Sequence, residues 1–368
     1  MICEIFFVLL AFVLSLIFGI LTIPQITTFC KKKNLYDLPN VRKVHSMNIP
    51  RMGGTCFMPC MIVAALFSVM VYRINKSEQL TVSLWSCMFM ISILLVYTVG
   101  LIDDLVGVSA RVKFLVQIVA ASLMPFSDLY INTLYGFLGI ESIPFYIGAP
   151  LTVFVIVFID NAINLIDGID GLAAGLSVLS LMGFLYCFMR EGLFVYSVLI
   201  AGLIGVVTSF LYYNVYGGKD NKYKIFMGDS GSLTLGFMLA FLLIKFTMHN
   251  PAVMPFRSDS LLIPYTLLIV PAFDVVRVVL SRLRSRQPIF KADKRHIHHK
   301  LLRCGLSQHR ALCVILLLQV FFVGVNIALF PLLSITYIVV IDVLVFVLFH
   351  LVVDVFIKRF EAKSVVQA

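Results

Sequence analysis

Charged residues are scarce in this sequence. Asp, Glu, Lys and Arg make up 13% of its 368 residues, whereas 61% are hydrophobic. A soluble domain is typically about 25% charged, so the composition argues against a soluble globule, a disordered chain and a nucleic-acid-binding protein. The hydrophobic residues occur in blocks of roughly twenty, the length that crosses the hydrocarbon core of a bilayer. The composition therefore predicts an all-α polytopic membrane protein.

Paired cysteine motifs and a soluble domain are also missing. The eight cysteines include no Cys-x-x-Cys pair, which argues against a disulfide scaffold or a zinc site. The N-terminus lacks the basic segment of a signal peptide, and its uncharged stretch from Ile5 to Cys30 is long enough to span, so we expect a retained first helix. We expect one transmembrane domain over residues 1–360 and a cytoplasmic tail over 361–368.

The uncharged stretches predict about eleven transmembrane helices. Their ranges are 5–28, 54–72, 81–101, 112–127, 143–161, 171–189, 193–213, 231–249, 260–280, 311–330 and 333–356. The first connecting loop carries six basic residues, so the positive-inside rule places it in the cytoplasm and the N-terminus outside. With this topology 24 of the 29 Lys and Arg residues, and the C-terminus, are cytoplasmic. We therefore expect a multi-pass protein of the cell inner (cytoplasmic) membrane.

Two adjacent acids, Asp103 and Asp104, end the predicted helix at 81–101. Carboxylates at a helix C-terminus oppose the helix dipole, so a solvated helix end explains this pair less well than a functional role. Neighbouring side chains point about 100° apart on a helix, so one acid can face a metal while the other faces a substrate.

A second polar cluster reads DNAINLIDGIDG and begins at Asp160. Asp160, Asn164 and Asp167 share one helical face by their spacing. Carboxylate and amide oxygens suit a hard cation or a ribose. A polar cap followed by a turn would explain one Asp, but not three Asp and two Asn residues within eleven.

The segment FMGDSGS, from Phe226 to Ser232, leads into the predicted helix at 231–249. Ordinary helix capping by Asp or Ser is one interpretation of it. The alternative is that its backbone N–H groups, at the positive end of a helix, receive a phosphate or a phosphate-bound metal. Asn214 lies shortly before this segment.

Two loops on the predicted cytoplasmic side combine histidine with basic residues. The later loop contains DKRHIHH, whose cations favour a phosphate or pyrophosphate over the alternative of a transition metal. The first loop contains NVRKVH and PRMGG, a basic turn that we expect to close over a substrate. Together, the five clusters indicate polyphosphate chemistry at one membrane face, with Mg²⁺ as the ion and Mn²⁺ able to substitute.

With these motifs the sequence resembles the polyprenyl-phosphate N-acetylhexosamine 1-phosphate transferases (glycosyltransferase 4 type), which share a superfamily with the phospho-MurNAc-pentapeptide translocases. The resemblance covers roughly residues 1–360. It rests on PNVRKVH…PRMGG, GLIDD, NAINLIDGIDGLAAG, FMGDSGSL and the HIHH loop after PAFDVVRVV, in that order. The split His-x-His-His spacing resembles the N-acetylhexosamine branch, because we expect three consecutive His residues in the pentapeptide translocases.

The resemblance implies transfer of a sugar 1-phosphate, by default GlcNAc 1-phosphate, from a UDP-sugar to undecaprenyl phosphate, with release of UMP. This reaction would begin the synthesis of a cell-envelope polysaccharide such as lipopolysaccharide O-antigen or teichoic acid. A homodimer through lipid-facing helices is a further expectation from the resemblance.

The site residues follow from the resemblance by position. The implied catalytic residues are Asp103, Asp104, Asp167 and His298. The implied substrate-binding residues are Arg42, Lys43, His45, Lys113, Asn164, Asp170, Asn214, Phe226, Arg295, His296 and His299. The implied Mg²⁺ ligands are Asp229 and Asn164. The acidic pair would lie near the lipid phosphate, Lys113 would neutralise it, and Phe226 would stack on uracil.

Three alternatives stay open at this point. The second pKa of a phosphate monoester is near 6, so the lipid phosphate can attack directly as a dianion, but prior attack by an Asp is also conceivable. The substrate could be phospho-MurNAc-pentapeptide. The chain could instead be a transporter, which should carry ionisable groups near the midpoints of its helices. The only candidates for such groups are Lys245, Asp274 and Asp342, and they form no evident path.

Overall fold

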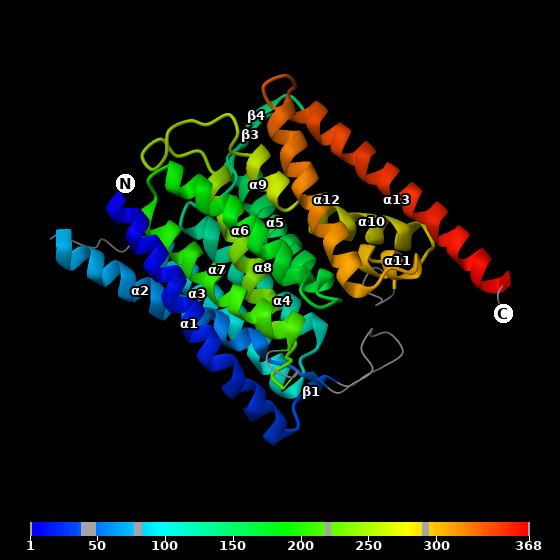
Figure 1. Cartoon of the computed structure of the whole chain (residues 1–368). Helices are drawn as coiled ribbons and strands as arrows, with labels where there is room; N and C mark the ends of the chain where they lie inside the picture. Colours follow the sequence, from blue (N-terminus) through cyan, green and yellow to red (C-terminus); the bar gives the residue numbers. More distant parts are fainter. Residues whose placement is uncertain (1, 38–48, 77–82, 218–221, 289–293, 367–368) are drawn as a thin grey trace.

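The computed structural model describes residues 2–37, 49–76, 83–217, 222–288 and 294–366, which form a bundle of α-helices (Figure 1). The helices are α1 (Ile2–Lys33), α2 (Phe57–Lys76), α3 (Leu84–Val106), α4 (Ala110–Phe126), α5 (Phe145–Ile166), α6 (Leu172–Arg190), α7 (Phe194–Tyr216), α8 (Asp229–Thr247), α9 (Leu262–Leu267), α10 (Ile269–Arg284), α11 (Ile297–Arg303), α12 (Gln308–Leu329) and α13 (Ile335–Val366). In this described part of the chain, nine helices are long and apolar enough to cross a membrane. The chain is thus a mostly helical, multi-pass membrane protein.

Two of the expected spans are not among these nine helices. The expected span at 112–127 coincides with α4, which has 17 residues. The expected span at 260–280 is two helices, α9 and α10, which meet at Leu268. Pro271 explains this break, because its ring conflicts with the carbonyl of Leu267 and it has no N–H to donate. The total of eleven spans and their orientation remain predictions.

Side chains of neighbouring helices satisfy the backbone groups around this break. Gln319 of α12 donates its Nε2 to the carbonyl of Thr266 (2.8 Å) and accepts from the N–H of Val270 (3.3 Å). Ser180 of α6 donates its hydroxyl to the carbonyl of Leu267 (2.6 Å). Such bonds let a helix break at membrane depth, where water is absent.

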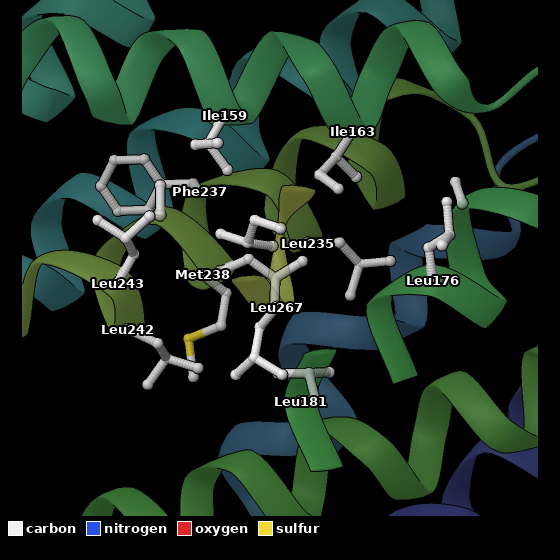
Figure 2. Close-up of a cluster of buried hydrophobic side chains, with 14 of the residues drawn as sticks. Ile159, Ile163, Leu176, Leu181, Leu235, Phe237, Met238, Leu242, Leu243 and Leu267 are labelled. Atoms are coloured by element: carbon white, nitrogen blue, oxygen red, sulfur yellow. The ribbon is translucent and has the colours of Figure 1, made fainter. Parts of the chain in front are cut away.

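Helix α8 lies inside the bundle, packed against α3 and α5. Every residue from 230 to 247 is buried, as expected for a helix that is apolar on all sides. Figure 2 shows Leu235 and Phe237 of α8 in one apolar cluster with Ile159 and Ile163 of α5. This packing fixes the position of the first turn of α8, which begins at Asp229.

Two short antiparallel hairpins, which the sequence did not predict, accompany the helices. The pairs are β1 (Tyr36–Asp37) with β2 (Ile49–Pro50), and β3 (Thr133–Phe137) with β4 (Ile140–Ser142). The carbonyl of Pro50 accepts a hydrogen bond from the N–H of Phe226 (2.8 Å). The β1–β2 hairpin therefore joins the end of the first loop to the segment that precedes α8.

Candidate functional site

A pocket of about 370 Å³ lies where α3 and α5 end and α8 begins. Nine of the residues that line it were predicted as site residues: Asp103, Asp104, Asn164, Asp167, Asp170, Asn214, Phe226, Asp229 and His299. The other lining residues are Arg51, Gly168, Ile169, Met227, Gly228, Ser232 and Gln308. Each of the five polar clusters contributes at least one residue, so the fold brings all five together.

Asp229, the first residue of α8, makes contacts with two other helices. Its Oδ2 is ion-paired with Lys113 of α4, and its Oδ1 accepts a hydrogen bond from Nδ2 of Asn164 on α5 (3.3 Å). Asn164 also donates Nδ2 to the hydroxyl of Ser232 (2.8 Å), and neither bond uses its amide oxygen. The Nζ of Lys113 lies 3.4 Å from Oδ2 of Asp103. One ammonium group therefore lies between two carboxylates.

The two adjacent acids have different partners. Asp104 is 3% exposed, and its carboxylate accepts from the N–H of Asp229 (2.9 Å) and from the N–H and hydroxyl of Ser230 (3.0 and 2.6 Å). A carboxylate in this place satisfies backbone donors that a helix start leaves unpaired and interacts favourably with the helix dipole. The prediction that these N–H groups receive a phosphate is wrong for Asp229 and Ser230, because Asp104 already binds both.

Glycines allow the segments around this helix start to approach closely. Gly228 has a φ of 76°, and a Cβ there would lie 2.6 Å from the carboxylate oxygens of Asp104. A Cβ on Gly54 would overlap the Cα of Gly231. The N–H of Gly54 donates to the carbonyl of Met227 (2.7 Å). The PRMGG segment is thus bonded directly to FMGDSGS.

A second ion pair, absent from the predicted site, borders the pocket. Lys224 places its Nζ 2.6 Å from Oδ2 of Asp170, in the glycine-rich turn that follows α5. Lys224 is one of the 24 basic residues that the positive-inside rule assigns to the cytoplasm, and it was not predicted to belong to the site. The available signal was its position two residues before Phe226, in the same segment as the acidic helix start.

Asn214 lines the pocket, but its side chain also binds two backbone groups. Its Oδ1 accepts from the N–H of Gly171 (2.6 Å), and its Nδ2 donates to the carbonyl of Ile225 (2.9 Å). These bonds fix the turn that carries Asp170 relative to the segment that carries Phe226. Asn214 therefore shapes this wall of the pocket.

The three expected histidines have different surroundings. His299 lines the pocket. His298 is 1% exposed, lies against Gly168, and has no hydrogen-bond partner for either ring nitrogen within the described residues. His296, outside the pocket, places its Nδ1 2.8 Å from Oδ2 of Asp274. Of the three, His299 is the one placed to meet a ligand.

Asp274 of α10 received no site role from the sequence, although it interrupts an apolar segment. It is 1% exposed and accepts a hydrogen bond from the N–H of Ile297 (3.0 Å) at the start of α11. Arg277 lies 2.7 Å from the same carboxylate and donates to the carbonyl of Arg295 (2.5 Å). Asp274 thus positions His296 and the first turn of the histidine-bearing helix.

Arg295, which was predicted to bind substrate, does not line the pocket. Arg295 donates to the hydroxyl of Ser281 (3.0 Å) and to Oε1 of Gln287 (3.2 Å), both outside the pocket lining. The predicted Arg42, Lys43 and His45 lie outside the described residues.

Burial makes His298 a source of pH-dependent stability. Burial, with a smaller effect of His299, lowers the pKa of His298 from 6.5 to about 3. Below pH 6.5 the imidazole of His298 binds a proton in the unfolded chain but not in the folded protein. The free energy of unfolding should therefore fall as the pH falls. At pH 5 the loss is about 2 kcal/mol. The midpoint of thermal unfolding should therefore drop less between pH 7.5 and pH 5 in His298→Gln than in the wild type. Equal drops would contradict this prediction.

Comparisons with known proteins all match this chain to transferases. The family model described as glycosyl transferase family 4 matches residues 85–247. A probable undecaprenyl-phosphate N-acetylglucosaminyl 1-phosphate transferase of Bacillus subtilis (strain 168) is 33% identical over 323 residues, which cover 86% of this chain and 83% of that protein. The undecaprenyl-phosphate alpha-N-acetylglucosaminyl 1-phosphate transferase of Salmonella typhi is 29% identical, with 80% of this chain and 77% of its own length covered. That of Yersinia pestis is 28% identical, with coverage of 78% and 74%.

Proposed function

Because the chain belongs to the polyprenyl-phosphate N-acetylhexosamine 1-phosphate transferases of glycosyl transferase family 4, we propose that it transfers GlcNAc 1-phosphate from UDP-GlcNAc to undecaprenyl phosphate. The products are undecaprenyl-pyrophosphoryl-GlcNAc and UMP. The observation that carries this proposal is the contact of Asp103, Lys113, Asn164 and Asp229 beside one pocket. Its volume of about 370 Å³ falls in the usual range of small-molecule sites.

The pocket belongs on the cytoplasmic face in this proposal. It lies at the helix ends next to the segments that carry most of the basic residues, and the positive-inside rule assigns such segments to the cytoplasm. The N-terminus would then be outside, the C-terminus inside, and the protein in the inner (cytoplasmic) membrane.

Mg²⁺ is the cofactor we assign to Asp229 and Asn164. The carboxylate of Asp229 and the amide oxygen of Asn164 are oxygen ligands of the kind that Mg²⁺ prefers. The ion pair of Asp229 with Lys113 supports the assignment, because it marks a place where the protein stabilises positive charge. When bound, the ion would neutralise the diphosphate of the donor and stabilise the leaving UMP.

The reaction brings two anions together, and basic residues in and beside the pocket assist it. An oxygen of the lipid phosphate attacks the β-phosphorus of UDP-GlcNAc, and the bond from that phosphorus to the oxygen of UMP breaks. Lys113, between Asp103 and Asp229, screens the acceptor phosphate. Arg51 lines the pocket, and its Nε has no hydrogen-bond partner among the described residues. That atom is buried, so it is the positive charge of the guanidinium that would attract the phosphates.

Direct attack is supported over a phospho-enzyme by the partners of the acidic pair. Both oxygens of Asp104 accept hydrogen bonds from the start of α8. Asp103 accepts from the N–H of Val108 (2.7 Å) through Oδ1 and faces Lys113 through Oδ2. Neither carboxylate is placed as a nucleophile. We expect no labelled protein after incubation with UDP-GlcNAc labelled in the β-phosphate and no lipid; a base-labile acyl-phosphate would show a two-step reaction.

The proposed function is tested by UMP release from the purified protein. UMP should appear only when UDP-GlcNAc, undecaprenyl phosphate and Mg²⁺ are all present. A panel with UDP-GalNAc and UDP-MurNAc-pentapeptide identifies the sugar. Preference for the pentapeptide substrate would favour the translocase alternative, and lipid-independent movement of a solute into vesicles without UMP would favour a transporter.

Lys224 should contribute to binding of the donor. In Lys224→Met, Asp170 loses the cation 2.6 Å from its carboxylate, so an unpaired negative charge would border the pocket. The KM for UDP-GlcNAc should rise about tenfold, equivalent to about 1.4 kcal/mol, with kcat nearly unchanged. Lys222→Met is the matched control, since the Nζ of Lys222 lies over the ring of Tyr223 instead. Equal KM values for the two variants would refute the assignment.

A further inference from the structure

The short helix α11, which carries His298 and His299, depends on its neighbours for its position. It has seven residues, and a helix of this length is not stable by itself in water. Asp274 of α10 holds its first turn through the N–H of Ile297. Its other end must be held by different contacts.

These contacts come from the C-terminal half of α13, which runs past α11 in Figure 1. The Nζ of Lys300 lies 2.7 Å from Oδ1 of Asp354, and Nη2 of Arg303 lies 2.8 Å from Oε1 of Glu361. The two bases are three residues apart on α11 and the two acids seven apart on α13, so each pair shares one helical face. The ion pairs therefore join two matching faces.

An apolar contact continues the same interface beyond the end of α11. Gly305 has a φ of 84°, and a Cβ there would lie 2.5 Å from the ring of Phe360 on α13. The Sγ of Cys304 lies 3.6 Å from the carbonyl of Val353. Helix α13 thus contacts α11 and the turn after it, while no described residue of α13 lines the pocket.

We propose that the C-terminal half of α13 is a positioning element of the active site: Asp354 and Glu361 hold α11, and with it His299, at the pocket. This inference rests on the proposed function, because its readout is the transfer reaction. Asp274 fixes one end of α11 and α13 fixes the other. No residue of α13 needs to touch a substrate for this role.

Charge reversal with rescue tests the proposal. The D354K/E361K variant replaces both attractions by repulsion and should lower kcat at least about tenfold, since a displacement of 1 Å in a site can reduce turnover about a hundredfold. Adding K300D/R303E restores opposite charges and should return most of the lost kcat. The control K358E/R359E changes two exposed charges on the same turns of α13. Neither Lys358 nor Arg359 forms an ion pair in the described part of the chain. It should keep the wild-type kcat.

The outcomes separate this proposal from the function on which it rests. An inactive wild-type protein would contradict the proposed function itself. If the wild type is active and the D354K/E361K variant keeps its kcat, the positioning role is overturned. It is also overturned if kcat falls and adding K300D/R303E does not restore it, although the midpoint of thermal unfolding is unchanged. If the reversal variant does not fold, the neutral D354N/E361Q variant replaces it, and an unchanged kcat there has the same meaning.

Discussion

Replacing Asp229 by Asn should lower kcat by about 10³-fold, with little change in the midpoint of thermal unfolding. Asn keeps the size of the side chain and can still accept the hydrogen bond from Asn164. It loses the negative charge that pairs with Lys113 and that we propose binds Mg²⁺. The measurement is UMP release at saturating concentrations of both substrates.

Asp128→Asn is the control for this variant. Asp128 lies in the turn after α4, away from the residues that line the pocket, and its φ of 59° suits Asn as well as Asp. It should keep the wild-type kcat. If Asp229→Asn stayed within about tenfold of the wild type, Asp229 would not be the principal metal ligand.

Asp104→Asn should reduce both stability and activity. The carboxylate accepts three hydrogen bonds at the start of α8, and an amide in its place would direct N–H groups toward backbone N–H donors. We expect a loss of about 2–4 kcal/mol, because buried donors are left unpaired. The kcat should fall as well, since Asp229 is the first residue of the helix that loses its cap.

Asp103→Asn is the informative comparison for Asp104→Asn. Its amide oxygen can still accept from the N–H of Val108, so thermal stability should change little while kcat falls through the weaker hold on Lys113. Thermal unfolding and UMP release of both variants show whether each acid acts mainly in the stability of the helix start or in the transfer reaction. An Asp104→Asn protein that is fully stable but inactive would show that Asp104 acts on the substrate directly.

The membrane-spanning helices were predictable because their signal depends on the length of uncharged stretches alone. The break between α9 and α10 was missed, although Pro271 marks it in the sequence. The β hairpins were missed because their strands have only two to five residues. Too few positions remain in such strands to form a recognisable alternation.

The candidate site was predictable as a set of segments, and less so as a set of roles. Asp103 and Asp104 are neighbours of one residue type, and only their contacts show that one faces Lys113 while the other caps α8. Lys224 is one base among many in the loops between the helices, and Asp274 is one acid in an apolar segment. Their roles arise from pairing with residues distant in sequence, which no local pattern encodes.

The fate of the β-phosphate of the donor is the most direct test of the proposed reaction. Wild-type protein, undecaprenyl phosphate and Mg²⁺ are incubated with UDP-GlcNAc that carries ³²P in the β-phosphate and ³H in the sugar. Both labels should enter the lipid in equal amounts, with unlabelled UMP released. Transfer of ³H alone with release of labelled UDP, or no transfer to lipid at all, would contradict the assignment of this protein as a sugar 1-phosphate transferase.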